Sequence, residues 1–498
     1  MSDGGPAMIQ RAERFAGRIA IVDAAGEHTY GDLLDASARV AGALLDGRDD
    51  LAEERVCFHV PPGFQHVAVQ WGIWRAGGMA VPLALSHPVP ELEYTVGDSD
   101  PAIVVAAGAG VESCRRIAGA GGRRFLPADD AIAHAPPRTL PEIGPGRRAM
   151  MVYTSGTTGR PRGVVTTHAS LGAQITTLVD AWAWTADDRI LLVLPLHHVH
   201  GIVNVVGCAL WSGATCEMLP AFDADVTWDA IASGRLTLFM AVPTIYRRLI
   251  DAYHAAAPAR QAAMREGAHK ARLMVSGSAA LPVQTLEEWR AITGHTLLER
   301  YGMTEIGMAL SNPLEGQRRP GAVGAPLPGV DVRIVNEEGQ PVAPGEPGSL
   351  EVRGPTVFQE YWRRPEATRD SFRDEWFVTG DHAVVEDGAF RLLGRSSVDI
   401  LKTGGYKVSA LEIEEVLREH PSIREVAVVG VADPEYGERV SAAVELKAGA
   451  SLALDELVAW GKERLAPYKV PRALRTVSAL PRNAMGKVMK PEVAKLFT

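Results

Sequence analysis

The chain is poor in cysteine, has no surplus of basic residues and has no long apolar run. Its cysteines are Cys57, Cys114, Cys208 and Cys216, and no two of them form a CxxC pair. This wide spacing argues against a zinc site and against a disulfide framework, and it fits a reducing compartment. No apolar segment approaches the roughly 18–20 residues that a membrane-spanning helix requires. We therefore expect a soluble protein without a membrane partner.

The charge balance excludes a further class of partner. The net charge is −9 and the isoelectric point is about 5.9, whereas proteins that bind nucleic acid usually carry a basic footprint. We expect no nucleic-acid partner. Near the N-terminus Arg11, Arg14 and Arg18 are interrupted by Asp3 and Glu13, and no apolar signal core is present. We expect a cytoplasmic location, with the mitochondrial matrix as the less favoured alternative.

Length and hydrophobic pattern indicate an α/β enzyme with more than one domain. At 498 residues the chain is too long for one compact core. Short apolar strands alternate with amphipathic helices, which predicts parallel sheets with sites at the strand ends. The expected helices span residues 27–47 and 65–77, and the expected strands span 55–60, 102–106, 149–153, 190–194, 237–242 and 271–276.

The pattern changes twice in the second half of the chain. Residues 323–393 contain short strands punctuated by Gly and Pro, which predicts an antiparallel, barrel-like region. A new unit begins after Gly394, with strands at 426–431 and 442–446 and helices at 410–419 and 454–464. We expect an α/β N-terminal domain, residues 1–394, built from two βα-layered subdomains and the barrel-like part. A smaller, mobile α+β domain, residues 395–498, should follow.

The strongest motif is an eleven-residue loop, YTSGTTGRPRG, which follows an apolar strand at residues 153–163. Hydroxyl side chains between glycines allow backbone N–H and side-chain O–H groups to converge on phosphate oxygens, and arginines add charge. It is not a Walker loop, which requires GxxxxGK[ST]. A flexible surface loop of the same composition is the alternative. The candidate phosphate-binding residues are Thr154, Ser155, Gly156, Thr157, Thr158, Gly159 and Arg162.

Five further motifs follow the loop in a fixed order: Gly277-Ser278-Ala279, Tyr301-Gly302-Met303-Thr304-Glu305, Thr379-Gly380-Asp381, Gly394-Arg395 and the Pro481–Lys487 segment PRNAMGK. Together they resemble the adenylate-forming superfamily of acyl-CoA synthetases, firefly luciferase and carrier-loading adenylation domains. The resemblance covers essentially the whole chain, although each short motif alone would be weak.

The resemblance implies ATP, Mg²⁺ and coenzyme A as ligands and assigns residues to them. It places Thr304 on the α-phosphate and Glu305 with Thr157 on Mg²⁺, a hard cation that prefers oxygen ligands. Asp381 and Arg395 should contact the ribose, because an acceptor-only carboxylate suits hydroxyl donors. The remaining nucleotide-binding candidates are Gly277, Ser278, Ala279, Glu299, Arg300, Tyr301, Gly302 and Met303.

Two C-terminal segments are assigned to separate half-reactions. Lys487 resembles the family's adenylation lysine, whose ammonium offsets the negative charge that concentrates when a carboxylate attacks the α-phosphate. Gly404 and Gly405 resemble the segment that lines the thiol's approach after the small domain rotates, so two conformations are implied. The pivot should lie within residues 396–399. The spacing between Arg395 and the glycines differs by about one residue from luciferase-like relatives, which leaves the hinge position open.

The acyl pocket is expected to hold a short dicarboxylic acid. A guanidinium facing this pocket would disfavour an alkyl chain, but it would pair with a second carboxylate. The segments around His200, Arg248 and Arg300 resemble malonyl-CoA and methylmalonyl-CoA synthetases, which bind the distal carboxylate on two arginines. The substrate-binding candidates are His200, Arg248, Ser276, Arg300, Gly404 and Gly405.

Several alternatives remain open. Arg300 could instead form an ion pair with Glu299 or Glu305, and Arg248 could lie on a solvated helix face. The chain departs from bacterial malonyl-CoA synthetases at residues 306–310, and Arg162 stands where the superfamily usually has lysine. Competing functions are a monocarboxylate or fatty acyl-CoA synthetase and an adenylation enzyme that loads a carrier protein. The oligomeric state, monomer or weak dimer, is also open.

Overall fold

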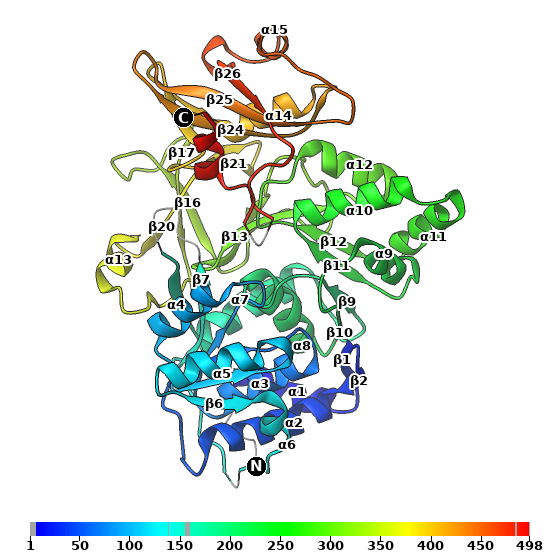
Figure 1. The fold of residues 1–498 in the computed structure, drawn as a ribbon, viewed down its shortest axis with the longest axis vertical. Coiled ribbons are helices and arrows are strands. Elements are labelled where there is room, and N and C mark those ends of the chain that lie inside the picture. The colour runs from blue at the N-terminus through cyan, green and yellow to red at the C-terminus, as the bar shows by residue number, and fades with distance from the viewer. Residues whose placement is uncertain (1–5, 138, 155–159, 484–485, 498) are drawn as a thin grey trace.

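The computed structural model describes residues 6–137, 139–154, 160–483 and 486–497. Two sheets flanked by helices form the larger part of the molecule, and a smaller C-terminal part lies at the top of Figure 1, in orange and red. Its lower edge faces the green helices α10 and α12 of the larger part. No helix in the described ranges is long and apolar enough to cross a membrane.

The first sheet has seven strands, and its centre is parallel. The strand order is β18 (Glu360–Tyr361), β8 (Arg162–Thr167), β7 (Arg148–Thr154), β4 (Met79–Pro82), β3 (Arg55–His59), β5 (Ile103–Ala106) and β6 (Arg124–Pro127). Only β8 and β18 run antiparallel to their neighbours. The associated helices are α2 (Tyr30–Leu45), α3 (Phe64–Arg75), α4 (Val89–Ser99), α5 (Val111–Ala120) and α6 (Ala128–Ala133), with the short turn η2 (Gly108–Gly110).

The second sheet has nine strands and carries most of the candidate site. The order is β15 (Ala325–Pro326), β14 (Gly307–Ser311), β13 (Leu298–Met303), β12 (Leu273–Ser276), β11 (Leu238–Ala241), β9 (Arg189–Leu192), β10 (Thr215–Met218), β1 (Ile19–Asp23) and β2 (Gly26–Thr29). Its helices are α1 (Ala7–Ala12), η1 (Glu13–Phe15), α7 (His168–Ala181), η3 (His200–Gly207), α8 (Cys208–Ser212), α9 (Ala224–Ala232), α10 (Pro243–Ala255), α11 (Pro258–His269) and α12 (Val283–Thr293). Because β9 and β11 to β13 are parallel, their carboxyl ends meet at one edge.

The expected helix at residues 27–47 is wrong at its N-terminal end. Residues Gly26–Thr29 form strand β2, which pairs with β1, and α2 begins only at Tyr30. The Thr29 side chain accepts from the Asp32 backbone N–H, and Asp32 caps the Thr29 N–H in return. This capping box fixes the helix start, because it satisfies N–H groups that have no partner within the helix.

The region after the second sheet is antiparallel, as the sequence predicts. Strands β16 (Asp331–Val335), β17 (Gly348–Arg353), β20 (Trp376–Glu386) and β19 (Phe372–Arg373) pair in that order, and β21 (Ala389–Arg395) pairs with β20. The helix α13 (Pro365–Asp370) lies between β18 and β19 in the chain. The β20–β21 hairpin carries the predicted ribose-binding residues Asp381 and Arg395, which are paired in register.

The C-terminal part has its own sheet and its own core. The order is β23 (Tyr406–Ser409), β22 (Ile400–Thr403), β25 (Gly437–Leu446) and β24 (Ile423–Asp433), with β26 (Ala473–Thr476) beside β25. Its helices are α14 (Ala410–Arg418), α15 (Leu454–Lys462), η4 (Pro467–Lys469), α16 (Lys490–Ala494) and η5 (Lys495–Phe497). The core under α14 begins at Leu401, whereas the main core of the larger part ends at Phe390. The chain therefore passes from the core of the larger part to the core of the C-terminal part between these two residues.

Candidate active site

Arg300 is the most unusual side chain at the edge where β12 and β13 end. It is 2% exposed, and its Nε and both Nη atoms lack a hydrogen-bond partner among the described residues. Burial lowers the pKa of this guanidinium to about 9. The alternative of an ion pair with Glu299 or Glu305 is wrong, because no described carboxylate bonds to the Arg300 nitrogens, although the Glu299 charge partly offsets the lowering of the Arg300 pKa. A buried cation without partners is costly, so this geometry favours binding of an anion.

Gly277 makes room for this guanidinium. A Cβ atom on Gly277 would lie 2.6 Å from Arg300 Cζ and 2.7 Å from Nε. Any side chain at position 277 would therefore displace Arg300. The glycine that the sequence predicted beside the nucleotide also shapes the position of the buried cation.

Two further buried polar atoms near Arg300, His200 Nε2 and Ser276 Oγ, have no hydrogen-bond partner among the described residues. His200, on η3, accepts or donates a hydrogen bond through Nδ1 to Ser278 Oγ at 3.2 Å, while its buried Nε2 has no partner in the described part of the chain. Burial, and then the nearby Arg300 charge, hold the pKa of His200 well below its usual value. The Ser276 hydroxyl, at the end of β12, is also buried without a described partner. The neutral imidazole of His200 and the hydroxyl of Ser276 thus lie near the Arg300 guanidinium.

Arg248 does not lie beside Arg300, as the predicted acyl pocket would require. Its side chain is on an exposed position of α10, and its Cζ atom lies 4.7 Å from the centre of the Phe222 ring. The structure does not bring its guanidinium into contact with Arg300. Its role in holding a distal carboxylate stays a prediction.

Asp381 links the antiparallel hairpin to β13. Its carboxylate accepts from the Tyr301 hydroxyl at 2.5 Å and from Arg395 Nε at 3.1 Å. Thr379 orients the same turn by accepting from the Asp381 backbone N–H at 3.1 Å. Three residues from separate sequence motifs are therefore brought together, as a shared nucleotide site requires.

Glu305 is a buried carboxylate that fits the chemistry of a magnesium ligand. Tyr361 donates to its Oε1 at 3.0 Å, and burial raises its pKa. Within the described residues, no group of three or more His, Cys, Asp or Glu side chains could hold a metal by itself. Mg²⁺ is usually bound through one or two carboxylates together with substrate phosphates and water, so a single Glu305 is compatible with it.

The structure describes the two flanks of the predicted phosphate loop. Ser155, Gly156, Thr157, Thr158 and Gly159 lie outside the described residues. The loop's flanks are described, since Thr154 at the end of β7 pairs with Arg162 at the start of β8. Arg162 Cζ lies 5.5 Å from the ring of Tyr361, the residue that contacts Glu305. The loop thus begins and ends close to the Glu305 region.

The C-terminal segment reaches this site. Figure 1 shows it descending in red from the top toward the ends of β12 and β13. Burial, together with the charges of Arg395 and Arg300, lowers the pKa of the Lys487 ammonium to about 8, while the Asp381 charge opposes this shift. A Cβ atom on Gly486 would lie 3.0 Å from Thr244 Oγ1 at the start of α10. Lys487 is therefore near both the Asp381 pair and the Arg300 group.

The other predicted residues are divided between this site and the surface. Thr304 is buried beside Glu305, whereas Gly302 and Met303 are half-buried and Ala279 is exposed. Gly404 and Gly405 lie in the exposed turn between β22 and β23, with φ angles of 56° and 83°. This turn is not brought to the site in the observed arrangement.

Glu299 supports the loop that follows β12. Its Oε1 accepts from the Leu281 backbone N–H at 3.1 Å, and burial raises the pKa of its carboxyl to about 8. Its backbone oxygen accepts from Asn312 Nδ2 at 3.0 Å. The structure thus shows Glu299 positioning the backbone near Gly277.

Sequence reasoning missed two contacts. Tyr361 lies far from Glu305 in the chain and belongs to none of the motifs. Glu415, on α14, accepts from the Val283 backbone N–H at the start of α12 at 2.8 Å, which joins the two cores. Neither residue gives a sequence signal, since each acts through a partner more than 50 residues away.

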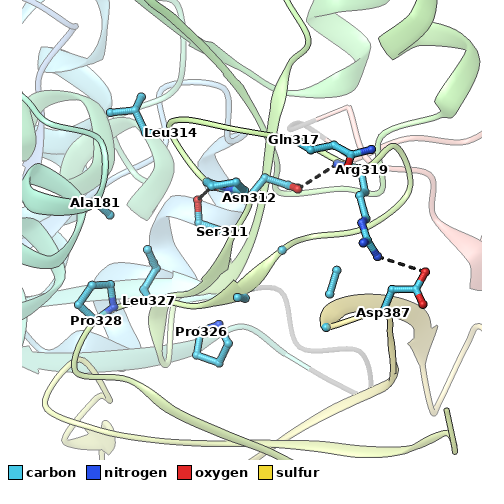
Figure 2. Close-up of a pocket in the computed structure, with 15 residues that line it drawn as sticks. Ala181, Ser311, Asn312, Leu314, Gln317, Arg319, Pro326, Leu327, Pro328 and Asp387 are labelled. Atoms are coloured by element: carbon cyan, nitrogen blue, oxygen red, sulfur yellow. Dashed lines mark hydrogen bonds and ion pairs between the residues drawn. The ribbon is translucent and has the colours of Figure 1, made fainter. Parts of the chain in front are cut away.

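A separate cavity of about 390 Å³ lies outside this constellation. Figure 2 shows it between the segment that includes Ser311 and Asn312 and the β20–β21 turn that carries Asp387. Arg319 and Asp387, which both line the cavity, form an ion pair of 3.4 Å. None of the predicted site residues lines this cavity, so it is not part of the candidate active site.

Comparison with known proteins covers almost the whole chain. Residues 8–362 match the AMP-binding enzyme family, and residues 412–487 match the AMP-binding enzyme C-terminal domain. The chain is 49% identical to the mitochondrial malonate–CoA ligase ACSF3 of Mus musculus, over 99% of this chain and 91% of that relative. The expected cytoplasmic location is contradicted by this comparison, because that relative is mitochondrial.

The solved structures agree with the sequence comparison. ATP-bound MatB from Rhodopseudomonas palustris is 36% identical, with a TM-score of 0.92 over 99% of each chain. Against apo MatB from the same organism the TM-score is 0.82 over the same coverage. The arrangement of this chain is therefore more similar to the ATP-bound structure than to the apo structure. Since the first family match covers well over half of the chain and the second ends at Lys487, the chain belongs to the AMP-binding enzyme family.

Proposed function

We propose that the protein is an acid–thiol ligase that converts malonate, ATP and coenzyme A to malonyl-CoA, AMP and pyrophosphate. Methylmalonate is the second candidate acid. The observation that carries the diacid assignment is Arg300, a buried guanidinium without a partner among the described residues. A second carboxylate on the acid would supply charge-assisted hydrogen bonds to it. The likeness to malonate–CoA ligases supports the same acid.

In the first half-reaction, one malonate oxygen attacks the α-phosphorus of ATP and the bond to pyrophosphate breaks. Lys487 would offset the negative charge that develops on the phosphoryl oxygens. Asp381 and Arg395 would hold the ribose, and Thr304 would contact the α-phosphate. Mg²⁺, held by Glu305 and by Thr157 of the phosphate loop, would neutralise charge on the phosphates.

In the second half-reaction, the thiol of coenzyme A attacks the acyl carbon and AMP leaves. We propose that residues 395–498 move as a domain against residues 1–394, so that Lys487 leaves the site and Gly404 with Gly405 enter. The turn at residues 396–399 is a suitable pivot. Asp399 accepts from the Arg395 backbone N–H at 3.0 Å, so the turn is closed on itself in this arrangement.

The competing acids fit this pocket less well. An alkyl chain in contact with Arg300 would leave the guanidinium unpaired, which is costly in a buried site. A fatty acid should therefore be a poor substrate. A carrier-loading enzyme would use the same first half-reaction, and the acceptor thiol alone distinguishes it.

The experiment is pyrophosphate release with malonate, methylmalonate, acetate and octanoate, each with ATP and coenzyme A. We expect the two diacids to exceed acetate and octanoate, and a higher rate with octanoate would contradict the proposal. Product analysis with coenzyme A and with a carrier protein as acceptors then identifies the thiol. Transfer to the carrier alone would support the carrier-loading function instead.

A further inference from the structure

Lys490 is a buried cation that follows Lys487 closely on the C-terminal tail. Its side chain is 11% exposed. The ammonium donates to the Val428 carbonyl oxygen at 2.7 Å, forms an ion pair with Glu414, and forms a second ion pair with Asp399 at 3.3 Å. These partners belong to β24, to α14 and to the turn at residues 396–399, the proposed pivot. One ammonium thus links three separate segments of the C-terminal part.

The two carboxylates that face Lys490 are both shielded from water. Glu414 is buried, and the Asp399 side chain is 15% exposed. Glu414 has a second, longer ion pair of 3.5 Å with Arg418. For Asp399, Lys490 is the one cation paired with it in the described part of the chain. A buried carboxylate without its counter-charge is costly, so this ammonium is difficult to remove from the cluster.

The segment that carries Lys487 is a hairpin that ends immediately before Lys490. Its two described arms are residues 481–483 and 487–489. The Met489 backbone N–H donates to the Pro481 carbonyl oxygen at 2.8 Å, and the Asn483 N–H donates to the Lys487 carbonyl oxygen at 2.9 Å. Asn483 Oδ1 in turn accepts from the Lys487 N–H at 3.0 Å. The backbone position of Lys487 therefore depends on where the hairpin as a whole is held.

A cation fixes each arm of this hairpin to the small sheet. On the first arm, Arg482 forms an ion pair of 3.2 Å with Glu425 of β24. Directly after the second arm, Lys490 makes the contacts described above. The Arg482 side chain is more exposed than that of Lys490, and charges shielded from water interact more strongly. The second anchor also includes Asp399 of the pivot turn, whose Oδ2 accepts from the Arg395 backbone N–H at 3.0 Å.

We propose that Lys490 is a positioning residue that holds the Lys487 hairpin against the pivot turn during the first half-reaction. This inference rests on the proposed function, in which Lys487 acts in adenylation and residues 395–498 then turn. Since the three partners of Lys490 lie in that domain, the anchor moves together with the hairpin. It returns Lys487 to the site in the same orientation at each turnover. The Lys490 ammonium is directed to its protein partners, so it acts through Lys487.

The test measures the two half-reactions separately in Lys490→Met. Methionine keeps an unbranched side chain of similar length and removes the charge. Adenylation, measured as pyrophosphate released in a single turnover with malonate and ATP, should slow about 10- to 100-fold, because small displacements of a reacting group have effects of this size. Enzyme that has already formed the adenylate should transfer the acyl group to coenzyme A within about twofold of the wild-type rate.

The pH profile of adenylation is a readout that general instability would not move. Lys487 has a pKa of about 8 because it is buried near the charges of Arg395 and Arg300. Without the anchor, water reaches Lys487 and its pKa rises toward that of a free lysine. The alkaline decline in kcat/KM for ATP should therefore move to higher pH in Lys490→Met. A slower variant with an unchanged profile would contradict the inference.

Two control variants accompany Lys490→Met. Lys490→Arg keeps a cation that can pair with both carboxylates, and it should recover most of the adenylation rate. Lys462→Met removes an exposed lysine at the end of α15 in the same domain, and it should match the wild type.

A milder variant covers the case in which Lys490→Met does not fold. Asp399→Asn keeps an acceptor for the Arg395 N–H but turns an amide NH₂ toward Lys490 in place of a carboxylate oxygen. It should slow adenylation and leave acyl transfer to coenzyme A unchanged.

The inference is overturned if Lys490→Met slows both half-reactions equally or if its adenylation rate equals that of Lys462→Met. Wild-type adenylation in Asp399→Asn would overturn it as well. If the wild-type enzyme releases no pyrophosphate with malonate, the proposed function fails instead, so the two failures are distinguishable.

Discussion

Replacing Arg300 by methionine should separate diacids from simple acids. The side chain is buried, and its three guanidinium nitrogens have no partner in the described chain, so a malonate carboxylate would be their main anion. Removing one member of a buried charge pair typically costs about 3–5 kcal/mol. Expressed in kcat/KM, this is a loss of roughly 10²- to 5 × 10³-fold for malonate. Propionate, which offers no second carboxylate, should lose little or gain.

The same substitution should stabilise the ligand-free protein. Replacing buried charges by apolar side chains of similar volume is often neutral or stabilising by about 1–4 kcal/mol. The melting temperature of Arg300→Met without ligands should therefore equal or exceed that of the wild type. Malonate should raise the melting temperature of the wild type more than that of the variant.

The assay is pyrophosphate release with malonate and with propionate, alongside thermal unfolding of each protein. Arg290→Met is the control, because Arg290 lies on α12 with a side chain that is 51% exposed. It should leave the malonate-to-propionate ratio unchanged. If Arg300→Met lowers activity equally with both acids and also lowers the melting temperature, Arg300 is a structural residue and the reasoning is refuted.

Three further perturbations follow from the site. Gly277→Ala should displace Arg300, since the new Cβ would lie 2.6 Å from its Cζ, and it should raise the KM for malonate by up to about 100-fold; an unchanged KM would show that the guanidinium is free to move. Lys487, with a pKa of about 8, loses its charge as pH rises, so kcat/KM for ATP should fall about tenfold per pH unit above that value. Lys487→Arg should remove this decline, and a decline that persists would assign it to another group. Glu415→Gln weakens the carboxylate contact with the Val283 N–H at the start of α12. Adenylation measured by stopped flow should therefore slow about two- to fivefold. An unchanged rate would show that this contact does not help to hold the C-terminal domain against α12.

Much of the fold could be predicted because buried parallel strands are simple apolar runs. Strands such as β11 and β12 are buried at every position, and the sequence analysis located them within two residues. The antiparallel edges were not predicted. Strand β2 reads Gly-Glu-His-Thr, which has no apolar alternation, and its pairing with β1 depends on the tertiary neighbour.

The sequence predicts those site residues that lie in recognisable motifs. It does not predict the contacts that depend on tertiary packing. Asp381, Arg395 and Tyr301 come from three motifs, and the structure joins them by hydrogen bonds. The unpaired state of Arg300 could not be read from the sequence, because its neighbour Glu299 directs its carboxylate to the Leu281 backbone instead. The position of Arg248 over Phe222 is likewise a matter of tertiary packing.

The tail that carries Lys487 is fixed to the same small sheet as the glycine turn. On β24, Val426 and Val428 face the core under α14, whereas Ala427 and Val429 face the residues of the C-terminal tail. Both segments are anchored to one sheet, so a loop movement alone would not exchange them.

The proposed exchange of the two segments would therefore require the small domain to turn as a unit. Described contacts across the domain boundary include the Glu415–Val283 hydrogen bond, the Lys407–Glu337 and Arg395–Asp381 ion pairs, and the hydrogen bond from the Ser409 hydroxyl to the Leu393 carbonyl oxygen. An exposed ion pair contributes at most about 1 kcal/mol, and a single hydrogen bond contributes about as much. We propose that the small domain turns against these individually weak contacts and so serves both half-reactions.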